Sequence, residues 1–152
     1  MADLFYFRLD TLLKIRKLKQ KQSMVELGRR IGELQGAQRD IVRTKSVRIS
    51  ARMKAEELRS VGVSGSLNRE LGVFEDASAN DVMASQRRAE ALAEQVTKQQ
   101  EELRKATMKK NAVQVLKDKA LEEWNVELRR KEDKELSETA LRGRMRRAEG
   151  EG

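Results

Sequence analysis

The chain has 152 residues; 38% of them are charged, 3% are aromatic, and none is proline, cysteine or histidine. The missing residue types exclude a disulfide framework, thiolate chemistry and histidine-based catalysis. Such a composition is typical of a coiled coil or long helix, since proline would break a helix interior.

Charge is distributed unevenly along the chain, whose net charge is +8. Residues 1–60 carry 15 basic and 7 acidic side chains, residues 61–103 carry 4 and 8, and residues 104–152 carry 14 and 10. Both ends are therefore basic and the middle is acidic. If the chain folds back on itself, we expect a dipolar rod that can orient between two differently charged partners.

The first predicted helix runs from about residue 8 to 60. Its apolar spacing alternates between three and four residues, which is typical of a coiled-coil stripe. This stripe comprises Met24, Leu27, Ile31, Leu34, Gln38 and Ile41. Beyond Ile41 a shifted stripe through Ala51, Ala55 and Leu58 predicts a stutter in the heptad pattern.

Residues 61–66 are the only stretch with turn chemistry. Gly62, Ser64 and Gly65 supply a helix C-cap and a new N-cap, so we expect an elbow here. Residues 67–80 are ambiguous, because Gly72 and Asn80 weaken a helical pattern. The second helix therefore begins at about residue 67 or 81. It continues to residue 146 with a stripe of Val82, Ala89, Leu92, Val96, Gln99, Leu103, Ala106 and Val113.

These elements predict an all-α fold, a long antiparallel two-helix coiled-coil hairpin. We expect one coiled-coil domain over residues 1–152, ending in a disordered tail at 147–152. Neither helix could bury its apolar stripe alone, which is why the two should pack together. No apolar run is long enough for a signal peptide or a membrane span, so we expect a cytoplasmic protein without direct membrane insertion.

No catalytic, cofactor or metal constellation is present in the sequence. Adjacent carboxylates such as Glu56-Glu57 point about 100° apart on a helix and lack an enclosing apolar pocket. The glycine-rich elbow lacks the Gly-Lys-Ser/Thr ending of a phosphate-binding loop. We therefore expect a non-enzymatic protein that binds other proteins, with no cofactor.

Two further features leave alternatives open. The basic cluster Lys14, Arg16, Lys17, Lys19 and Lys21 fits a protein-docking surface or an ordinary solvated face better than nucleic acid, because aromatic stacking platforms are missing. The sole tryptophan, Trp124, either packs within the hairpin or contacts another protein. Near the other end of the chain, Phe5, Tyr6 and Phe7 likewise either pack within the hairpin or contact another protein.

Both ends of the chain carry distinctive sequence stretches. Residues 5–16 read Phe-Tyr-Phe-Arg-Leu-Asp-Thr-Leu-Leu-Lys-Ile-Arg. This stretch resembles the opening of FliJ-type flagellar export proteins, a family that typically begins with Phe-x-Phe-x-Leu, a Leu-Leu pair and basic residues. The stretch from Leu116 to Ala140 is similar to the family's C-terminal part, with Leu136-Ser137-Glu138 where the family tends to have Leu-Asp-Glu. The middle has no matching motif, although its length and layout agree.

This resemblance implies a function and partners. FliJ-like proteins are antiparallel two-helix coiled coils that insert into the hexameric export ATPase ring, connect it to the export-gate membrane protein, and are linked to export chaperones. The protein would then lie at the inner face of the cell membrane through the export apparatus and serve motility. The paired termini would contact the ATPase ring through Phe5, Phe7, Leu9, Leu12, Leu13, Lys14, Arg16, Lys17, Trp124, Arg130 and Lys134. The elbow region would contact the gate through Ile41, Lys45, Arg48, Leu71, Phe74 and Met83.

Three other interpretations stay open at this point. The chain also resembles the stalk protein of virulence type III secretion. It could instead be a generic coiled-coil scaffold that dimerises through its apolar stripe. A basic helix pair that binds nucleic acid is the least favoured.

Overall fold

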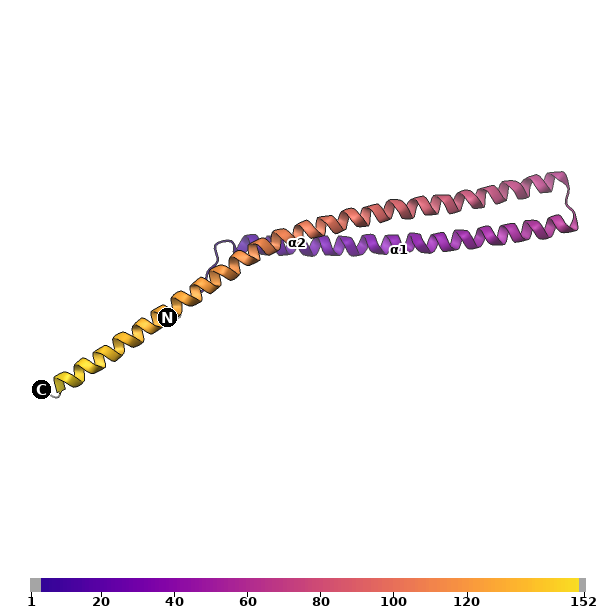
Figure 1. Cartoon of the computed structure of the whole chain (residues 1–152). Helices are drawn as coiled ribbons and strands as arrows, with labels where there is room; N and C mark the ends of the chain where they lie inside the picture. The colour runs from indigo at the N-terminus through magenta and orange to yellow at the C-terminus, as the bar shows by residue number, and fades with distance from the viewer. Residues whose placement is uncertain (1–3, 151–152) are drawn as a thin grey trace. The chain divides into compact units, whose positions relative to one another are not determined.

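The structure is a computed structural model that describes residues 4–150, and it consists of two helices packed as an antiparallel hairpin (Figure 1). Helix α1 spans Asp10–Val61 and helix α2 spans Gly65–Gly150. The expected fold class is confirmed. Residues 67–80 belong to α2, and so do residues 147–150, where we expected a disordered tail; residues 151–152 lie outside the described part.

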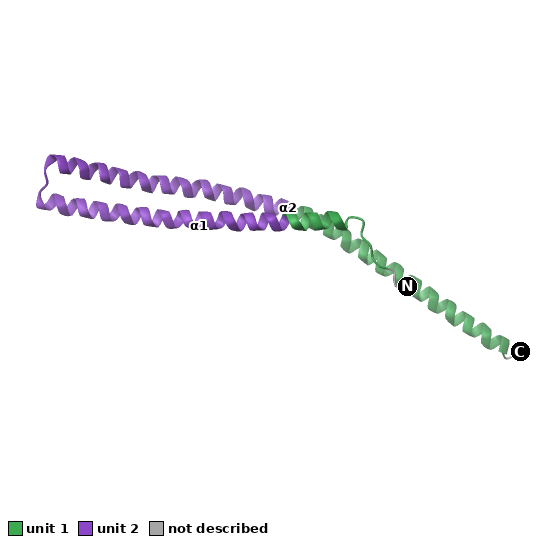
Figure 2. Ribbon diagram, turned by 180° about the vertical axis from the view of Figure 1, so that it is seen from behind, with its two compact units in different colours: residues 1–19, 107–152 green, residues 20–106 purple. Residues whose placement is uncertain are grey.

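The chain divides into two compact units (Figure 2). Unit 1 comprises residues 1–19 and 107–152, and unit 2 comprises residues 20–106. Each unit pairs a stretch of α1 with a stretch of α2, and each is described by itself below. That the chain forms one coiled-coil domain stays a prediction.

In unit 2 each helix turns a continuous heptad stripe toward the other, and we call these paired stripes the seam. Every member is buried or half-buried, and successive members are three and four residues apart, as in a coiled coil. On α1 the seam comprises Gln20, Ser23, Leu27, Arg30, Leu34, Ala37, Ile41, Thr44, Arg48, Ala51, Ala55 and Leu58. On α2 it comprises Leu71, Glu75, Ser78, Val82, Ser85, Ala89, Leu92, Val96, Gln99, Leu103 and Ala106.

The stripe expected on α1 was wrong at three positions, Met24, Ile31 and Gln38. Each lies one residue beyond a seam member, namely Ser23, Arg30 and Ala37. Met24 is 54% exposed and Gln38 is exposed, whereas Ala37 is only 2% exposed. The heptad continues through Ala37 and Thr44 without the predicted stutter. Large apolar side chains had defined the expected stripe, but the real seam alternates them with small and polar residues.

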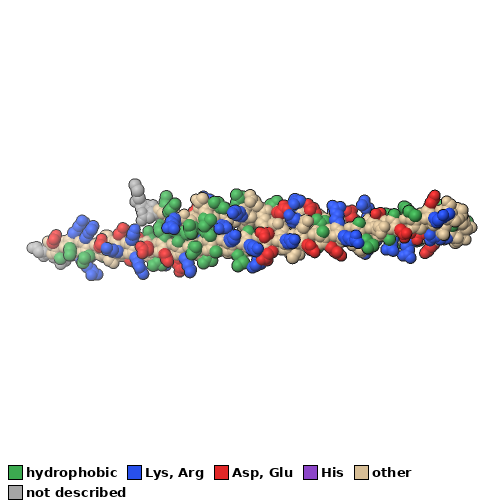
Figure 3. Space-filling model, turned by 90° about the horizontal axis from the view of Figure 1, so that it is seen from above, with side chains coloured by type: hydrophobic (Ala, Val, Ile, Leu, Met, Phe, Trp, Pro, Cys, Tyr) green, Lys and Arg blue, Asp and Glu red, His purple; other side chains and the backbone are tan. Residues whose placement is uncertain are grey.

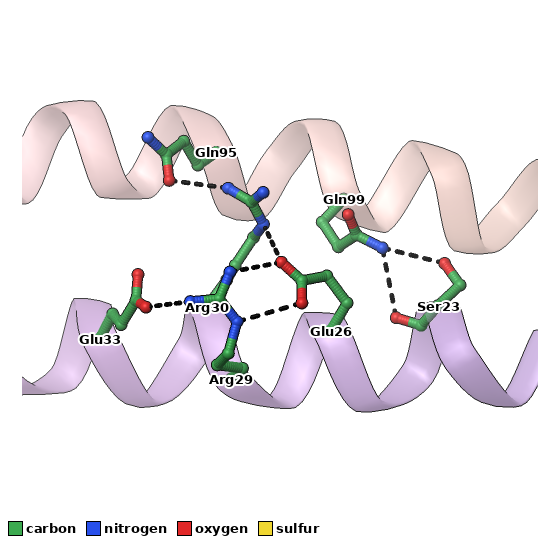
Figure 4. A network of polar contacts seen from close by, with 7 residues as sticks. All are labelled: Ser23, Glu26, Arg29, Arg30, Glu33, Gln95 and Gln99. Atoms are coloured by element: carbon green, nitrogen blue, oxygen red, sulfur yellow. Dashed lines mark hydrogen bonds and ion pairs between the residues drawn. The ribbon is translucent and has the colours of Figure 1, made fainter.

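Polar seam residues pair across the two helices (Figure 4). The Gln99 amide donates hydrogen bonds to the Ser23 hydroxyl at 3.0 Å and the Ser23 carbonyl at 3.3 Å. Further along α1, Arg30 donates to Gln95 at 2.7 Å and to Glu26 at 3.0 Å. Such partners stabilise one register of the helices, because any slip would leave half-buried polar groups unpaired.

The elbow is built from one glycine and one serine. Gly62 has φ +99°, a left-handed conformation that suits glycine at a helix C-terminus. The Ser64 hydroxyl accepts a hydrogen bond from the Leu67 amide at 3.2 Å, which caps the N-terminus of α2. The C-cap and N-cap expected at the elbow are therefore confirmed. Arg59 stabilises the turn from α1, because its guanidinium donates a hydrogen bond to the Asn68 side chain at 2.8 Å and forms an ion pair with Glu75.

The same substitution should have opposite effects at two glycines. Gly62→Ala forces a side chain into the left-handed region and should lower the free energy of unfolding by about 1–2 kcal/mol. Gly32 lies inside α1, and the space that a Cβ would occupy there is open, so Gly32→Ala should raise that free energy by about 0.8–1 kcal/mol. Urea unfolding followed by circular dichroism measures both. Equal changes in the two variants would contradict the role of Gly62 in the elbow.

Candidate functional site

Phe5, Phe7 and Trp124, three of the predicted ATPase contacts, are half-buried in unit 1. The rings of Phe5 and Trp124 meet edge to face, with centroids 5.9 Å apart and planes at 60°. Aromatic pairs favour this geometry, because the positive edge of one ring faces the negative face of the other. Of the two possibilities for Trp124, packing within the hairpin is therefore seen.

A polar contact lies where α1 begins. Lys117 Nζ is 3.0 Å from Asp10 Oδ1, and Lys14 Nζ is 3.6 Å from Asp10 Oδ2. The hydrogen bond from Lys117 is the main reason that the pKa of Asp10 lies below its usual value; the positive charges of Lys117 and Lys14 add to this effect, which desolvation opposes. This contact ties the first turn of α1 to α2, and the carboxylate also suits the helix N-terminus.

The predicted ATPase contacts differ in how accessible they are. Leu13 is 1% exposed and packs inside unit 1. A second group is half-buried: Phe5, Phe7, Leu9, Leu12, Arg16 and Trp124. The exposed group comprises Lys14, Lys17, Arg130 and Lys134. All eleven lie in unit 1, but only the four cations present mostly open side chains, and contact with an ATPase stays a prediction for every one.

Unit 1 also exposes apolar side chains that the sequence interpretation left out of the site. Ile15 is 45% exposed and Leu18 is 56% exposed on α1, and Met108 and Val115 are 57% and 52% exposed on α2. Ile15 and Leu18 both lie off the helix face of Leu13, since they follow it by two and five positions. Their offset from the heptad positions of Leu9 and Leu13 is the signal that could have identified them.

The elbow half of unit 2, which comprises residues 37–61 of α1 and residues 65–88 of α2, buries mostly small side chains and exposes many large ones. The buried positions include Ala37, Ala51, Ala55 and Ser78. The exposed ones include Val42, Ile49, Met53, Val73, Phe74 and Met83, each 48% exposed or more. On the face drawn in Figure 3, hydrophobic side chains are sparse toward the elbow, at the right, and gather mainly left of the centre, among interspersed cations and anions. Small seam residues leave little apolar area to hold this half together, while its outer faces keep apolar area for a partner.

The six predicted gate contacts all belong to this half. Phe74 is 55% exposed, Met83 is 48% exposed, and Lys45 is exposed. Ile41, Arg48 and Leu71 are half-buried seam residues. The first three are thus available to a partner, and the last three mainly hold the two helices together. Contact with the gate stays a prediction for all six.

An open polar cleft also lies in the elbow half, lined by Ala37, Asp40, Arg43, Thr44, Asp81, Ala84, Ser85 and Arg88. Asp40 is 3.5 Å from Arg43 and 3.9 Å from Arg88, so the charges largely offset one another. In the part of the chain that the structure describes, no group of three acidic side chains is placed to hold a metal ion. Within residues 4–150, neither helix is long and apolar enough to cross a membrane.

The Asp10 contact makes a prediction about pH. Because the folded-state pKa of Asp10 is lowered, its stabilising effect is present above the unfolded pKa, near the ordinary value of 3.8, and is lost as pH falls through the folded value. Asp10→Asn should therefore lower the free energy of unfolding at pH 7, and this deficit should shrink as pH falls below 3.8 toward 2. Urea titrations of both proteins at both pH values measure this. A deficit that persists undiminished at pH 2 would exclude the charge effect.

Comparison with known proteins gives a family for the chain. The family model described as "Flagellar FliJ protein" matches residues 5–149, nearly the whole sequence. No curated protein and no solved structure matches the chain. The hairpin fold and the arrangement of its termini agree with the resemblance found in the sequence. The chain therefore belongs to the FliJ family, whose members are non-catalytic components of the flagellar export apparatus.

Proposed function

We propose that this protein is the stalk that couples the hexameric export ATPase to the export gate of the flagellar apparatus. Unit 1 enters the ATPase ring, and the elbow half of unit 2 contacts the gate's membrane protein. Export chaperones are further partners. The protein itself hydrolyses nothing, works in the cytoplasm and is peripheral at the inner face of the cell membrane through these partners.

One observation carries this proposal: two separate surfaces of different chemistry lie in the two units. Unit 1 combines exposed cations, Lys14 and Lys17 among them, with exposed Ile15 and Leu18. In the elbow half of unit 2, the acidic stretch of α2 lies beside a basic stretch of α1, so the charge there is mixed, and large apolar side chains such as Phe74 lie on its outer faces. A surface of exposed cations and a surface of mixed charge with large exposed apolar side chains favour different partners, because each partner is selected by complementary charge and apolar contact.

The unit 1 surface suits the inside of a protein ring. Lys14 and Lys17 are exposed on α1, and Arg130 and Lys134 are exposed on α2, so cations flank the paired segments on both helices. Mobile Lys and Arg side chains accept acidic groups with little demand on geometry, which suits a partner built of repeated subunits. The apolar side chains beside them supply burial that charge alone does not.

Paired charge reversals test the two surfaces separately. Lys14→Glu/Lys17→Glu should weaken association with the purified ATPase about 10-fold or more, because attraction becomes repulsion. The matched control, Lys45→Glu/Lys54→Glu, reverses two exposed cations of α1 in unit 2 and should leave that association within about 2-fold. Sedimentation and ATP turnover in the presence of the protein measure the effect.

The gate surface needs its own variant. Phe74→Ala/Met83→Ala removes two exposed apolar side chains and should weaken binding to the cytoplasmic part of the gate protein about 10-fold or more, without changing ATPase association. Unaltered ATPase turnover and no association between the unmodified protein and the ATPase would contradict the stalk function outright. Equal losses of both partners in either variant would contradict the separation of the surfaces.

A further inference from the structure

Residues 4–9 precede α1 in unit 1 as a short non-helical segment that we call the N-terminal strap. Exposure alternates along it: Leu4 is 90% and Tyr6 is 82% exposed, whereas Phe5 and Phe7 are half-buried. Such alternation is what an extended chain produces when one side faces a neighbour and the other faces solvent. The neighbour is α2, since the ring of Phe5 packs against Trp124.

The strap is held on α2 by side-chain packing. Within residues 4–150, no hydrogen bond or ion pair joins residues 4–8 to α2. Its backbone hydrogen bonds lead into α1 instead: the Phe7 carbonyl accepts from the Asp10 amide at 3.1 Å, and the Leu9 carbonyl accepts from the Leu13 amide at 2.9 Å. Ordering an extended segment costs conformational entropy at every residue, and here few contacts offset that cost.

By contrast, the start of α1 is firmly attached to α2. Asp10 contacts Lys117 at 3.0 Å, and Leu13 is 1% exposed. The firm attachment therefore begins at residue 10, directly after the strap. Leu9 is half-buried and its carbonyl accepts from the Leu13 amide, so residues 4–8 are the part of the strap that can move away while the packing of α1 on α2 stays in place.

Opening the strap would change what unit 1 presents to a partner. The Phe5 ring covers part of the indole of Trp124, beside a shallow recess lined by Trp124, Glu127, Leu128 and Lys131. With the strap away, the face of α2 that carries Trp124 and Leu128 is uncovered, and Phe5 and Phe7 are free to contact another protein. Leu4 and Tyr6 are exposed while the strap is closed, so a partner can contact their apolar side chains before the strap opens.

We propose that the strap is an autoinhibitory cover that must open before unit 1 binds its partner. In the free chain the strap occupies the Trp124 face, and opening exchanges this internal contact for an external one. Binding of the partner then includes the free energy of opening the strap. The apparent dissociation constant is therefore the intrinsic constant divided by the fraction of chains whose strap is open. That the partner is the export ATPase rests on the proposed function; that the strap opens and closes does not.

The first test measures opening in the free, full-length chain. Trp124 is the only tryptophan and the chain has no cysteine, so Tyr6→Cys carrying a nitroxide places a short-range quencher on the strap alone. Time-resolved fluorescence of Trp124 should show a quenched closed population and an unquenched open one. Adding Phe5→Ala should enlarge the open population. The same label on exposed Leu136→Cys is the control and should leave Trp124 unquenched.

The second test locks the strap shut. Replacing Phe5 with the photoreactive aromatic p-benzoylphenylalanine and irradiating the free chain should join the strap to α2, which mass spectrometry of the digest confirms. The locked chain should bind the ATPase about 10-fold or more weakly than the same variant kept in the dark. The control is the same amino acid in place of exposed Phe74, irradiated in the same way; it should bind the ATPase equally well with and without light.

The outcomes separate the two proposals. A single Trp124 lifetime that Phe5→Ala does not change, or equal ATPase binding by locked and dark chains, would overturn the autoinhibitory strap. If the unmodified protein and the dark variant both fail to bind the ATPase, the proposed function fails. In that case the Trp124 fluorescence lifetimes alone decide whether the strap opens and closes.

Discussion

The register between the two helices depends on polar groups placed inside the seam of unit 2. A seam of leucine alone would hold two helices together but would permit slipping by a heptad. Here Ser23 and Arg30 interrupt the apolar positions of α1, and Gln99 and Gln95 of α2 supply their partners. A slipped arrangement would separate Ser23 from Gln99, which are both half-buried. It would also separate Arg30 from Gln95, although Arg30 would keep Glu26 of its own helix. The elbow adds a second constraint, because Gly62 and Ser64 fix where one helix ends and the next begins.

That register explains why the outer faces are available for binding. Towards the elbow the seam alternates alanine and serine with the larger residues Ile41, Leu58, Leu71 and Val82. Many other large apolar side chains stay outside it, among them Val42, Ile49, Phe74 and Met83. Exposed apolar side chains in such number are typical of surfaces that bind other proteins. In unit 1 the same logic applies to Ile15 and Leu18, which stand beside exposed lysines.

Much of the fold could be predicted from the sequence, and the failures have a common cause. The absence of proline, the turn residues at 61–66 and the apolar heptads predicted the hairpin and the stripe of α2 correctly. The stripe of α1 was misplaced at Met24, Ile31 and Gln38, since large apolar residues were counted and Ala37 was not. Burial in a two-helix hairpin depends on angular position, so a small residue on the inner face is buried while methionine on the flank is not.

The candidate site was less predictable than the fold. Sequence motifs indicated the right ends of the chain, but they could not tell packing from docking. Leu13 and Trp124 contribute to the internal packing of unit 1, whereas Ile15 and Leu18, one to three positions from motif residues, stay outside. The spacing Gly28, Gly32 and Gly36 on α1 was also overlooked, and nothing in the hairpin packs closely enough on Gly28 or Gly32 to require glycine there. Side-chain direction, and therefore availability to a partner, follows only once the pairing of the helices is known.

The central claim is that α1 and α2 of one chain pair with each other in this register. Ser23→Cys/Gln99→Cys places the only two thiols of the chain at a seam contact, where the native side chains are 3.0 Å apart. A short bismaleimide added to a mixture of tagged and untagged double variants should join the thiols within single chains at every protein concentration. Covalent tagged–untagged dimers that increase with concentration, with few internal links, would contradict the hairpin and favour a dimeric coiled coil.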